Sequence, residues 1–222
     1  YTNQENQEVS KGYKEEGYFN DAFINMLALL GWNPGTEQEI FSLEELAKEF
    51  KIERVSKAGA KFSPDKTKWF NQQYMQQKSN EDISKLFAEL YADKLLGFEQ
   101  DYITKVISLV KERAIFTKDL WELSDYFFIN PNSYDPKATK KQWKEDTASI
   151  MKDVKEIVKE IASFKSLEIE TKIKDYLTEK ELGFGKVIPP LRLAIVGAMK
   201  GPHLFDIIEM IGKENTLTRI EK

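Results

Sequence analysis

The chain has 222 residues, of which 41% are hydrophobic and 32% charged, which is enough for one large domain or two small ones. It has no cysteine and a single histidine, His203, which excludes disulfides, thiolate sites and multi-histidine metal sites and argues against a Ser-His-Asp mechanism. No apolar run approaches the roughly 18 residues of a membrane span, and the first residues lack the pattern of a signal peptide.

Apolar residues at helical spacing predict a run of helices in the first half of the chain, after a polar and flexible start. Ser42–Glu45 is typical of a capping box, and Ser63 precedes a proline that can occupy the first helical position. The helices are expected over residues 19–31, 42–50, 63–77, 79–97 and 103–110, and from residue 117.

A break over residues 127–136, which contains two prolines, separates these helices from a second helical region. The strongest amphipathic pattern follows over 143–164, and a shorter one covers 169–177. Leu182–Gly185 is expected to be a loop, and the last clear helix is expected over 204–211, closed by Gly212. No alternating strand pattern competes with these segments, so the sequence predicts an all-α protein of ten or more helices.

Charge is distributed unevenly along the chain, although the net charge is only −4. Residues 48–78 carry eight Lys and Arg against three acids, whereas residues 79–101 carry two Lys against six acids. A local basic face is compatible with docking on a phosphate backbone, but the same counts also fit two solvated helix faces.

Only four of the 33 basic residues are arginines, namely Arg54, Arg113, Arg192 and Arg219. Because guanidinium groups can pair with base edges and lysine ammonium groups act as point charges, these four are the candidates for reading bases. Little else suggests chemistry, since the Gly-rich segment 183–186 lacks the spacing of a phosphate-binding loop and His203 precedes an apolar helix.

Several segments resemble bacterial-type glutamyl-tRNA synthetases in their order along the chain. The first contains the run EEGYF at residues 15–19 and ends in LALLGW at residues 27–32, and the run PLRLAIVG occupies residues 190–197. The other matching segments are 39–45, 53–57, 62–66, 69, 71–74, 201–205 and 212–214.

The resemblance implies a class I ligase that attaches glutamate to tRNA(Glu) with ATP and Mg²⁺. Neither the HIGH nor the KMSKS motif of that family occurs in these residues, so this chain alone is expected to be inactive and to bind no cofactor. It is expected to be the tRNA-binding part of a cytoplasmic, monomeric enzyme that binds neither DNA nor membranes.

The same resemblance divides the chain into a stem-contact helical domain followed by an all-helical anticodon-binding region. The expected segments are 1–12 as a flexible remnant of the catalytic-loop region, 13–78 as the stem-contact domain, and 79–136 and 137–222 as two anticodon-binding subdomains.

The family's tRNA contacts fall on eight positions of this sequence. The positions that match contacts with the tRNA stem are Glu39, Ser56, Lys66 and Trp69. Those that match anticodon recognition are Arg113, which stands where the family has an Arg that reads the third anticodon base, and Arg192, Pro202 and Leu204. Gly201 stands where some relatives have Thr.

The residues themselves leave alternatives open at several of these positions. Trp69 and Leu204 also fit core positions, and Arg113 also fits a simple helix-end charge. Arg54 and Arg219 are expected to form surface salt bridges, and Arg192, between apolar neighbours, is expected to meet a carboxylate or RNA. Two other functions stay open: a helical protein-interaction module without RNA binding, and a relative that binds another tRNA.

Overall fold

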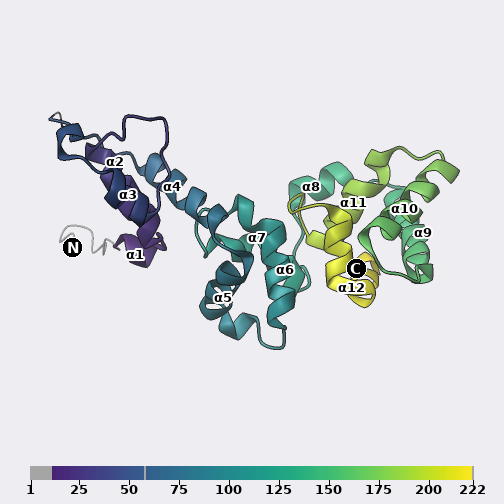
Figure 1. Cartoon of the computed structure of the whole chain (residues 1–222). Coiled ribbons are helices and arrows are strands. Elements are labelled where there is room, and N and C mark those ends of the chain that lie inside the picture. Colours follow the sequence, from purple (N-terminus) through teal and green to yellow (C-terminus); the bar gives the residue numbers. More distant parts are fainter. Residues whose placement is uncertain (1–11, 58, 222) are drawn as a thin grey trace, which may run out of the picture. The chain divides into compact units, whose positions relative to one another are not determined.

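The computed structural model describes residues 12–57 and 59–221, so most of the expected flexible start lies outside the described residues. Within these ranges the fold is all-α, with twelve α-helices, three 3₁₀ turns and no strand beyond an isolated bridge between Trp32 and Val55 (Figure 1). The all-α prediction is therefore confirmed. No described helix is both long enough and apolar enough to cross a membrane.

Contacts divide the chain into two compact units. Unit 1 comprises Tyr1–Asp93 and Gly97–Leu120, and unit 2 comprises Lys94–Leu96 and Trp121–Lys222. The division falls inside helix α7, Asp119–Phe128. The expected boundaries at residues 78 and 136 stay predictions.

Unit 1 is built from short helices, three of which begin with a side-chain cap. The capping box is present, since the Glu45 amide donates to Ser42 Oγ over 3.1 Å and the Ser42 amide donates to Glu45 Oε2 over 2.7 Å. The α-helices that lie wholly in unit 1 are α1 Tyr13–Glu16, α2 Asn20–Gly31, α3 Leu43–Glu49, α4 Pro64–Gln77, α5 Asn80–Leu90 and α6 Gln100–Val110. The 3₁₀ turns are η1 Ile52–Arg54 and η3 Lys111–Arg113 in unit 1, and η2 Ala92–Lys94, whose last residue belongs to unit 2. Helix α5 ends at Leu90 rather than at Gly97, because the chain turns into η2 first.

Two fully buried asparagines join the packed helices of unit 1. Asn25 on α2 accepts the Phe41 amide over 2.9 Å and the Tyr74 hydroxyl of α4 over 2.8 Å. Asn71 on α4 accepts the Phe19 amide over 2.8 Å and donates to the Ile115 carbonyl over 2.6 Å. Each amide therefore satisfies backbone groups of loops that would otherwise be buried without partners.

Unit 2 packs α12 against α9, α10 and α11, and α11 against α8. Its α-helices after α7 are α8 Pro136–Gln142, α9 Thr147–Glu160, α10 Ser166–Glu179, α11 Phe184–Val196 and α12 Leu204–Glu221. The amphipathic pattern expected over 143–164 is thus carried by a shorter helix. It begins at Thr147, whose hydroxyl accepts the Lys144 amide over 2.8 Å, and α8 ends just before Trp143.

Two sequence expectations in unit 2 were wrong in detail. Residues 182–185 were expected to be a loop, but α11 begins at Phe184 and contains Pro189 and Pro190. Inside a helix each proline removes a donor and its ring crowds the carbonyl four residues earlier, so packing of buried residues such as Val187 and Leu191 has to offset that cost. Gly212 does break its helix, with φ 81°, but a further helical segment follows it within α12.

Candidate nucleic-acid interface

The residues matched to tRNA stem contacts form a surface cluster in unit 1. Lys66 lies in the first turn of α4, and its Nζ is 2.6 Å from Glu39 Oε1 on the loop between α2 and α3. The same ammonium group lies 4.0 Å from the centre of the Trp69 ring. Lys66 and Glu39 keep 43% and 47% of their side chains exposed. We call Glu39, Lys66 and Trp69 the stem cluster.

Trp69 is neither a core residue nor a freely exposed one. It is half-buried and meets Phe70 edge-on, with ring centres 5.0 Å apart. A hollow of about 200 Å³ beside the cluster is lined by Lys61 and Lys66 among others. Ser56 is exposed on a nearby loop, where its amide donates to the Gly31 carbonyl over 2.8 Å. The structure therefore brings three of the four predicted stem residues together and holds Ser56 separately.

Arg113 is the last residue of η3, directly after helix α6. The face of α6 that includes Val106 and Ile107 is fully buried, whereas Arg113 is exposed. Lys111 Nζ donates to the Lys78 carbonyl at the end of α4 over 2.6 Å, which fixes the turn. Among the described residues, Arg113 makes no hydrogen bond or ion pair, so a fixed turn presents a guanidinium with all its donors available.

The loop over residues 197–203 joins α11 to α12 and is held by charged side chains that bind carbonyl oxygens. Arg192 Nη1 donates to the Lys200 carbonyl over 3.0 Å and to the Pro202 carbonyl over 2.9 Å. Lys200 Nζ donates to the Glu122 carbonyl over 2.6 Å and to Asp125 Oδ1 over 3.2 Å. The expectation that Arg192 meets a carboxylate or RNA stays a prediction, and the two partners described here are main-chain carbonyls.

Gly201 explains why this loop approaches α7 so closely. Its φ is 100°, and a Cβ atom there would lie 2.8 Å from the hydroxyl oxygen of Tyr126. Any larger residue would have to displace the loop or the tyrosine ring, in addition to the strain of a positive φ. A threonine therefore does not fit this arrangement of the loop.

Leu204 begins α12 and is 1% exposed, so its side chain belongs to the core of unit 2. Pro202 is half-buried and Arg192 is partly exposed. Three anticodon positions were predicted in unit 2. Arg192 is hydrogen-bonded to the Pro202 carbonyl, and Leu204 is a buried core residue directly after the loop.

The prediction of a surface salt bridge at Arg219 was wrong. Arg219 is 3% exposed, and its guanidinium donates to the Tyr126 and Ile195 carbonyls and to Asn130 Oδ1, each over 2.8 Å. It therefore joins α12 to the ends of α7 and α11. Arg54, by contrast, is exposed and donates to the Pro34 carbonyl. Sequence reasoning missed Arg219 because most of its partners are backbone carbonyls, which no side-chain pattern indicates.

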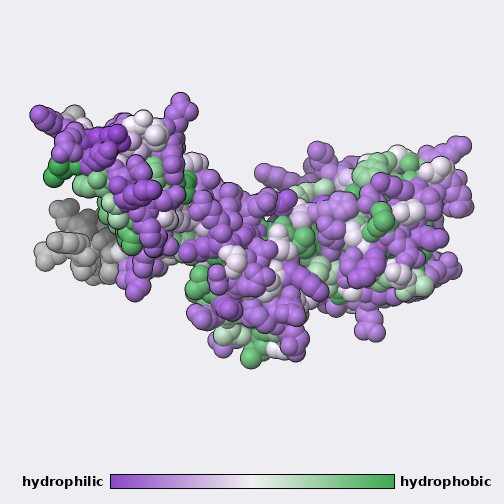
Figure 2. Space-filling view, in the orientation of Figure 1, coloured by the Kyte–Doolittle hydropathy of each residue, from purple (hydrophilic) through white to green (hydrophobic). Residues whose placement is uncertain are grey.

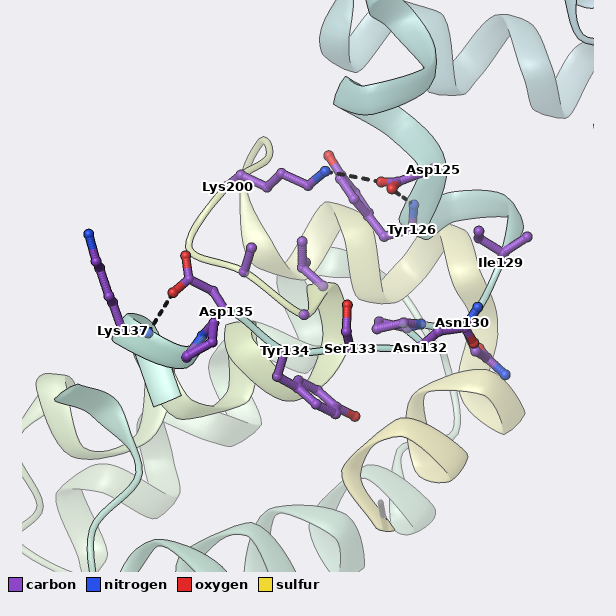
Figure 3. Close-up of a pocket in the computed structure, with 15 residues that line it drawn as sticks. Asp125, Tyr126, Ile129, Asn130, Asn132, Ser133, Tyr134, Asp135, Lys137 and Lys200 are labelled. Atoms are coloured by element: carbon purple, nitrogen blue, oxygen red, sulfur yellow. Dashed lines mark hydrogen bonds and ion pairs between the residues drawn. The ribbon is translucent and has the colours of Figure 1, made fainter. Parts of the chain in front are cut away.

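A groove of about 760 Å³ lies beside the 197–203 loop in unit 2 (Figure 3). One wall is the segment between α7 and α8, residues 129–135, and the other includes residues 196–198 and Lys200. Sequence analysis treated this segment only as a break between helices. Its asparagines and serine would have been the signal of a polar surface.

The chain belongs to the family of anticodon-binding domains, because the family model described as "Anticodon binding domain" matches residues 72–222. A second model, described as "tRNA synthetases class I (E and Q), catalytic domain", matches residues 3–69.

Within that class, the relatives found are glutamate–tRNA ligases, as the sequence resemblance predicted. The ligase of Flavobacterium psychrophilum is 56% identical over 98% of this chain and 43% of its own length. The ligase of Flavobacterium johnsoniae is 51% identical over 96% of this chain and 42% of its own length. The chain thus spans less than half the length of these relatives.

Solved structures agree in fold as well as sequence. A crystal structure of a glutamate tRNA ligase from Elizabethkingia meningosepticum matches with a TM-score of 0.93 and 45% identity, over 100% of this chain and 44% of that one. The glutamate-tRNA synthetase of Elizabethkingia anophelis matches with a TM-score of 0.87 and 44% identity, over 100% of this chain and 43% of that one.

Proposed function

We propose that this chain is the tRNA-binding part of a glutamate–tRNA ligase, which holds the tRNA(Glu) stem through unit 1 and discriminates its anticodon. The whole enzyme would attach glutamate to tRNA(Glu) with ATP and Mg²⁺, as a monomer in the cytoplasm. The observation that carries the proposal is the match of the anticodon-binding family model to residues 72–222.

The stem cluster supports the first half of this proposal. Its Lys66–Glu39 ion pair is exposed, and exposed pairs contribute only about 0–1 kcal/mol, so a phosphate can replace the carboxylate at little cost. Ammonium–phosphate contacts position RNA without reading its sequence. The half-buried Trp69 ring helps to position Lys66 through a cation–π contact.

Two features support anticodon recognition. Arg113 presents an exposed guanidinium without partners among the described residues, on a turn fixed from α4. The 197–203 loop is held in one conformation before any ligand binds. Anticodon bases are single-stranded and unstacked, so fixed donors and a fixed loop can read their edges.

The competing function, a protein-interaction module, would need a continuous apolar groove on the surface. Figure 2 shows a face dominated by hydrophilic residues, with hydrophobic residues in small separate groups. The ligase proposal is the better supported of the two, because the anticodon-binding family model matches residues 72–222.

Direct binding tests the proposal. Fluorescence anisotropy would compare tRNA(Glu) with versions changed at single anticodon bases, at several salt concentrations. We expect tighter binding of the unchanged tRNA and an affinity that falls steadily as salt rises. Equal affinity for every anticodon would contradict anticodon recognition, and no measurable tRNA binding would contradict the whole proposal.

A further inference from the structure

The groove beside the 197–203 loop has walls that are fixed by bonds beneath and across it. The Asp135 amide donates to the Gly197 carbonyl over 2.8 Å and ties the two walls together. Beneath them, buried Arg219 holds Asn130 Oδ1 over 2.8 Å. Gly197 has a φ of 82°, and a Cβ there would lie 2.8 Å from the Ser133 carbonyl, so the close approach requires glycine. The groove is therefore a preformed feature of unit 2.

Asn132 and Ser133 supply unused hydrogen-bonding groups on one wall. Both side chains are exposed, and neither forms a hydrogen bond among the described residues. Figure 3 shows them next to each other on the segment between α7 and α8, with Asp125 and Lys200 above them in that view. An amide and a hydroxyl both donate and accept, so together they can pair with the edge of a nucleobase.

The charges around the groove favour a neutral ligand over a phosphate. Asp125 is paired with Lys200, and Asp135 Oδ1 accepts the Lys137 and Ala138 amides over 2.8 and 2.9 Å. Two carboxylates and two ammonium groups line the groove, so they leave no net positive charge to attract a phosphate. A volume of about 760 Å³ is ample for one base and its ribose.

We propose that this groove binds one unstacked nucleobase of the tRNA anticodon loop, and that Asn132 and Ser133 determine which base it accepts. The inference rests on the proposed tRNA-binding function and adds to it a base subsite on the wall opposite the 197–203 loop. A base that pairs with both groups gains two hydrogen bonds, whereas a wrong base leaves one or both unpaired.

The test uses the 222-residue chain and anticodon stem–loop RNAs of tRNA(Glu) changed at one loop base at a time. The variants are N132A/S133A, which removes the polar groups, and S133W, which fills the groove. S163W is the matched control, since Ser163 is an exposed serine of unit 2 on the loop between α9 and α10. Thermal unfolding of each variant would verify that its fold is unchanged.

We expect N132A/S133A to bind the unchanged RNA roughly tenfold more weakly, because two neutral hydrogen bonds are lost. The variant should also lose its base preference at one loop position. S133W should bind more weakly still, and S163W should bind as the parent does. RNAs with 4-thiouridine at single loop positions should crosslink to residues 129–137 from one position. If S133W does not fold, the alanine variant and the crosslinks decide the question.

Three results would overturn the inference, and they have different consequences for the proposed function. If the parent prefers the unchanged anticodon but N132A/S133A keeps every preference, or if no loop position crosslinks to 129–137, the groove is not a base subsite and the proposed function stands. If the parent itself shows no anticodon preference, the anticodon-recognition part of the proposed function fails, and the groove inference fails with it.

Discussion

The stem cluster in unit 1 and the 197–203 loop in unit 2 are both matched to tRNA contacts, but they are built in opposite ways. The stem cluster consists of exposed side chains that contact one another, Lys66 with Glu39 and Trp69. The 197–203 loop is held by Arg192 and Lys200, which bind its own backbone and that of α7, above the buried Arg219.

This difference suggests a division of labour. An exposed lysine exchanges its carboxylate for any phosphate, so it adds affinity for every RNA alike. A loop held in one conformation before binding does not have to be ordered by the ligand, so a mismatched base is not accommodated. Four predictions test whether stability depends on buried groups, discrimination on a guanidinium presented by a fixed turn, and affinity on an exposed ion pair.

The largest effect is expected for Arg219→Met. Several buried carbonyls and Asn130 would lose a charged donor at about 1–3 kcal/mol each, so the free energy of unfolding of unit 2 should fall by about 3–5 kcal/mol. Urea unfolding followed by tryptophan fluorescence measures this. Arg54→Met is the control and should cost under about 1 kcal/mol, because Arg54 is exposed. Equal losses of unfolding free energy in both variants would contradict the role of Arg219 in joining α12 to α7 and α11.

Arg113→Ala should leave stability almost unchanged and remove about 1–3 kcal/mol of discrimination at the third anticodon base. Its side chain is exposed and has no partner among the described residues, so the fold does not depend on it. The measurement compares tRNA(Glu) with a version changed only at that base. Arg113→Lys keeps the charge without the planar fork and should lose discrimination too. If the preference survives in both variants, Arg113 does not read that base.

Tyr74→Phe should lower the free energy of unfolding of unit 1 by about 0.5–1.5 kcal/mol, because the single hydrogen of the buried hydroxyl is shared between Asn25 Oδ1 and the Phe41 carbonyl. The variant should also respond differently to alkali. Burial raises the pKa of Tyr74 to about 12, above its ordinary value of 10.0.

The sign of that pH effect follows from the direction of the shift. The folded state keeps the Tyr74 proton after the unfolded state has lost it, so its contribution is complete below pH 10 and is lost as pH rises from about 10 to about 12. Between pH 9 and 12 the free energy of unfolding of the parent should therefore fall more steeply with pH than that of Tyr74→Phe. Tyr18 and Tyr176, whose pKa values burial also raises, keep some slope in both proteins. If the two curves of unfolding free energy against pH are parallel, Tyr74 does not contribute to the pH dependence.

The smallest effect is expected for Lys66→Ala. It should weaken every tRNA by a similar factor and reduce the slope of log affinity against log salt by about 0.7–0.9, the share of one phosphate contact. Lys159→Ala is a matched control, since Lys159 is also exposed and paired with an acid, Glu156. A loss confined to one tRNA would show that Lys66 contributes to discrimination instead.

Much of the fold follows from local patterns. The capping box at Ser42, the Ser63-Pro64 start and the glycine that ends α2 each act within one turn of chain, so helices α2, α3 and α4 begin and end within one residue of the predicted limits. The resemblance to glutamyl-tRNA synthetases is confirmed by the comparisons. Prediction was weaker where prolines lie inside α11, because packing of its apolar face outweighs the lost hydrogen bonds.

The sequence by itself determined the all-α class and the approximate limits of α2, α3 and α4, because each depends on spacing between near neighbours in the chain. The family was indicated by resemblance to known sequences. It also indicated the exposed positions of Lys66 and Arg113, since charged residues next to helix ends are rarely buried. Only the tertiary structure decided that Arg219 is buried, that Arg192 holds a loop and that the 129–135 segment walls a groove. Those roles depend on carbonyl oxygens brought together from up to 93 residues away, and every residue type carries the same carbonyl, so no sequence pattern marks them.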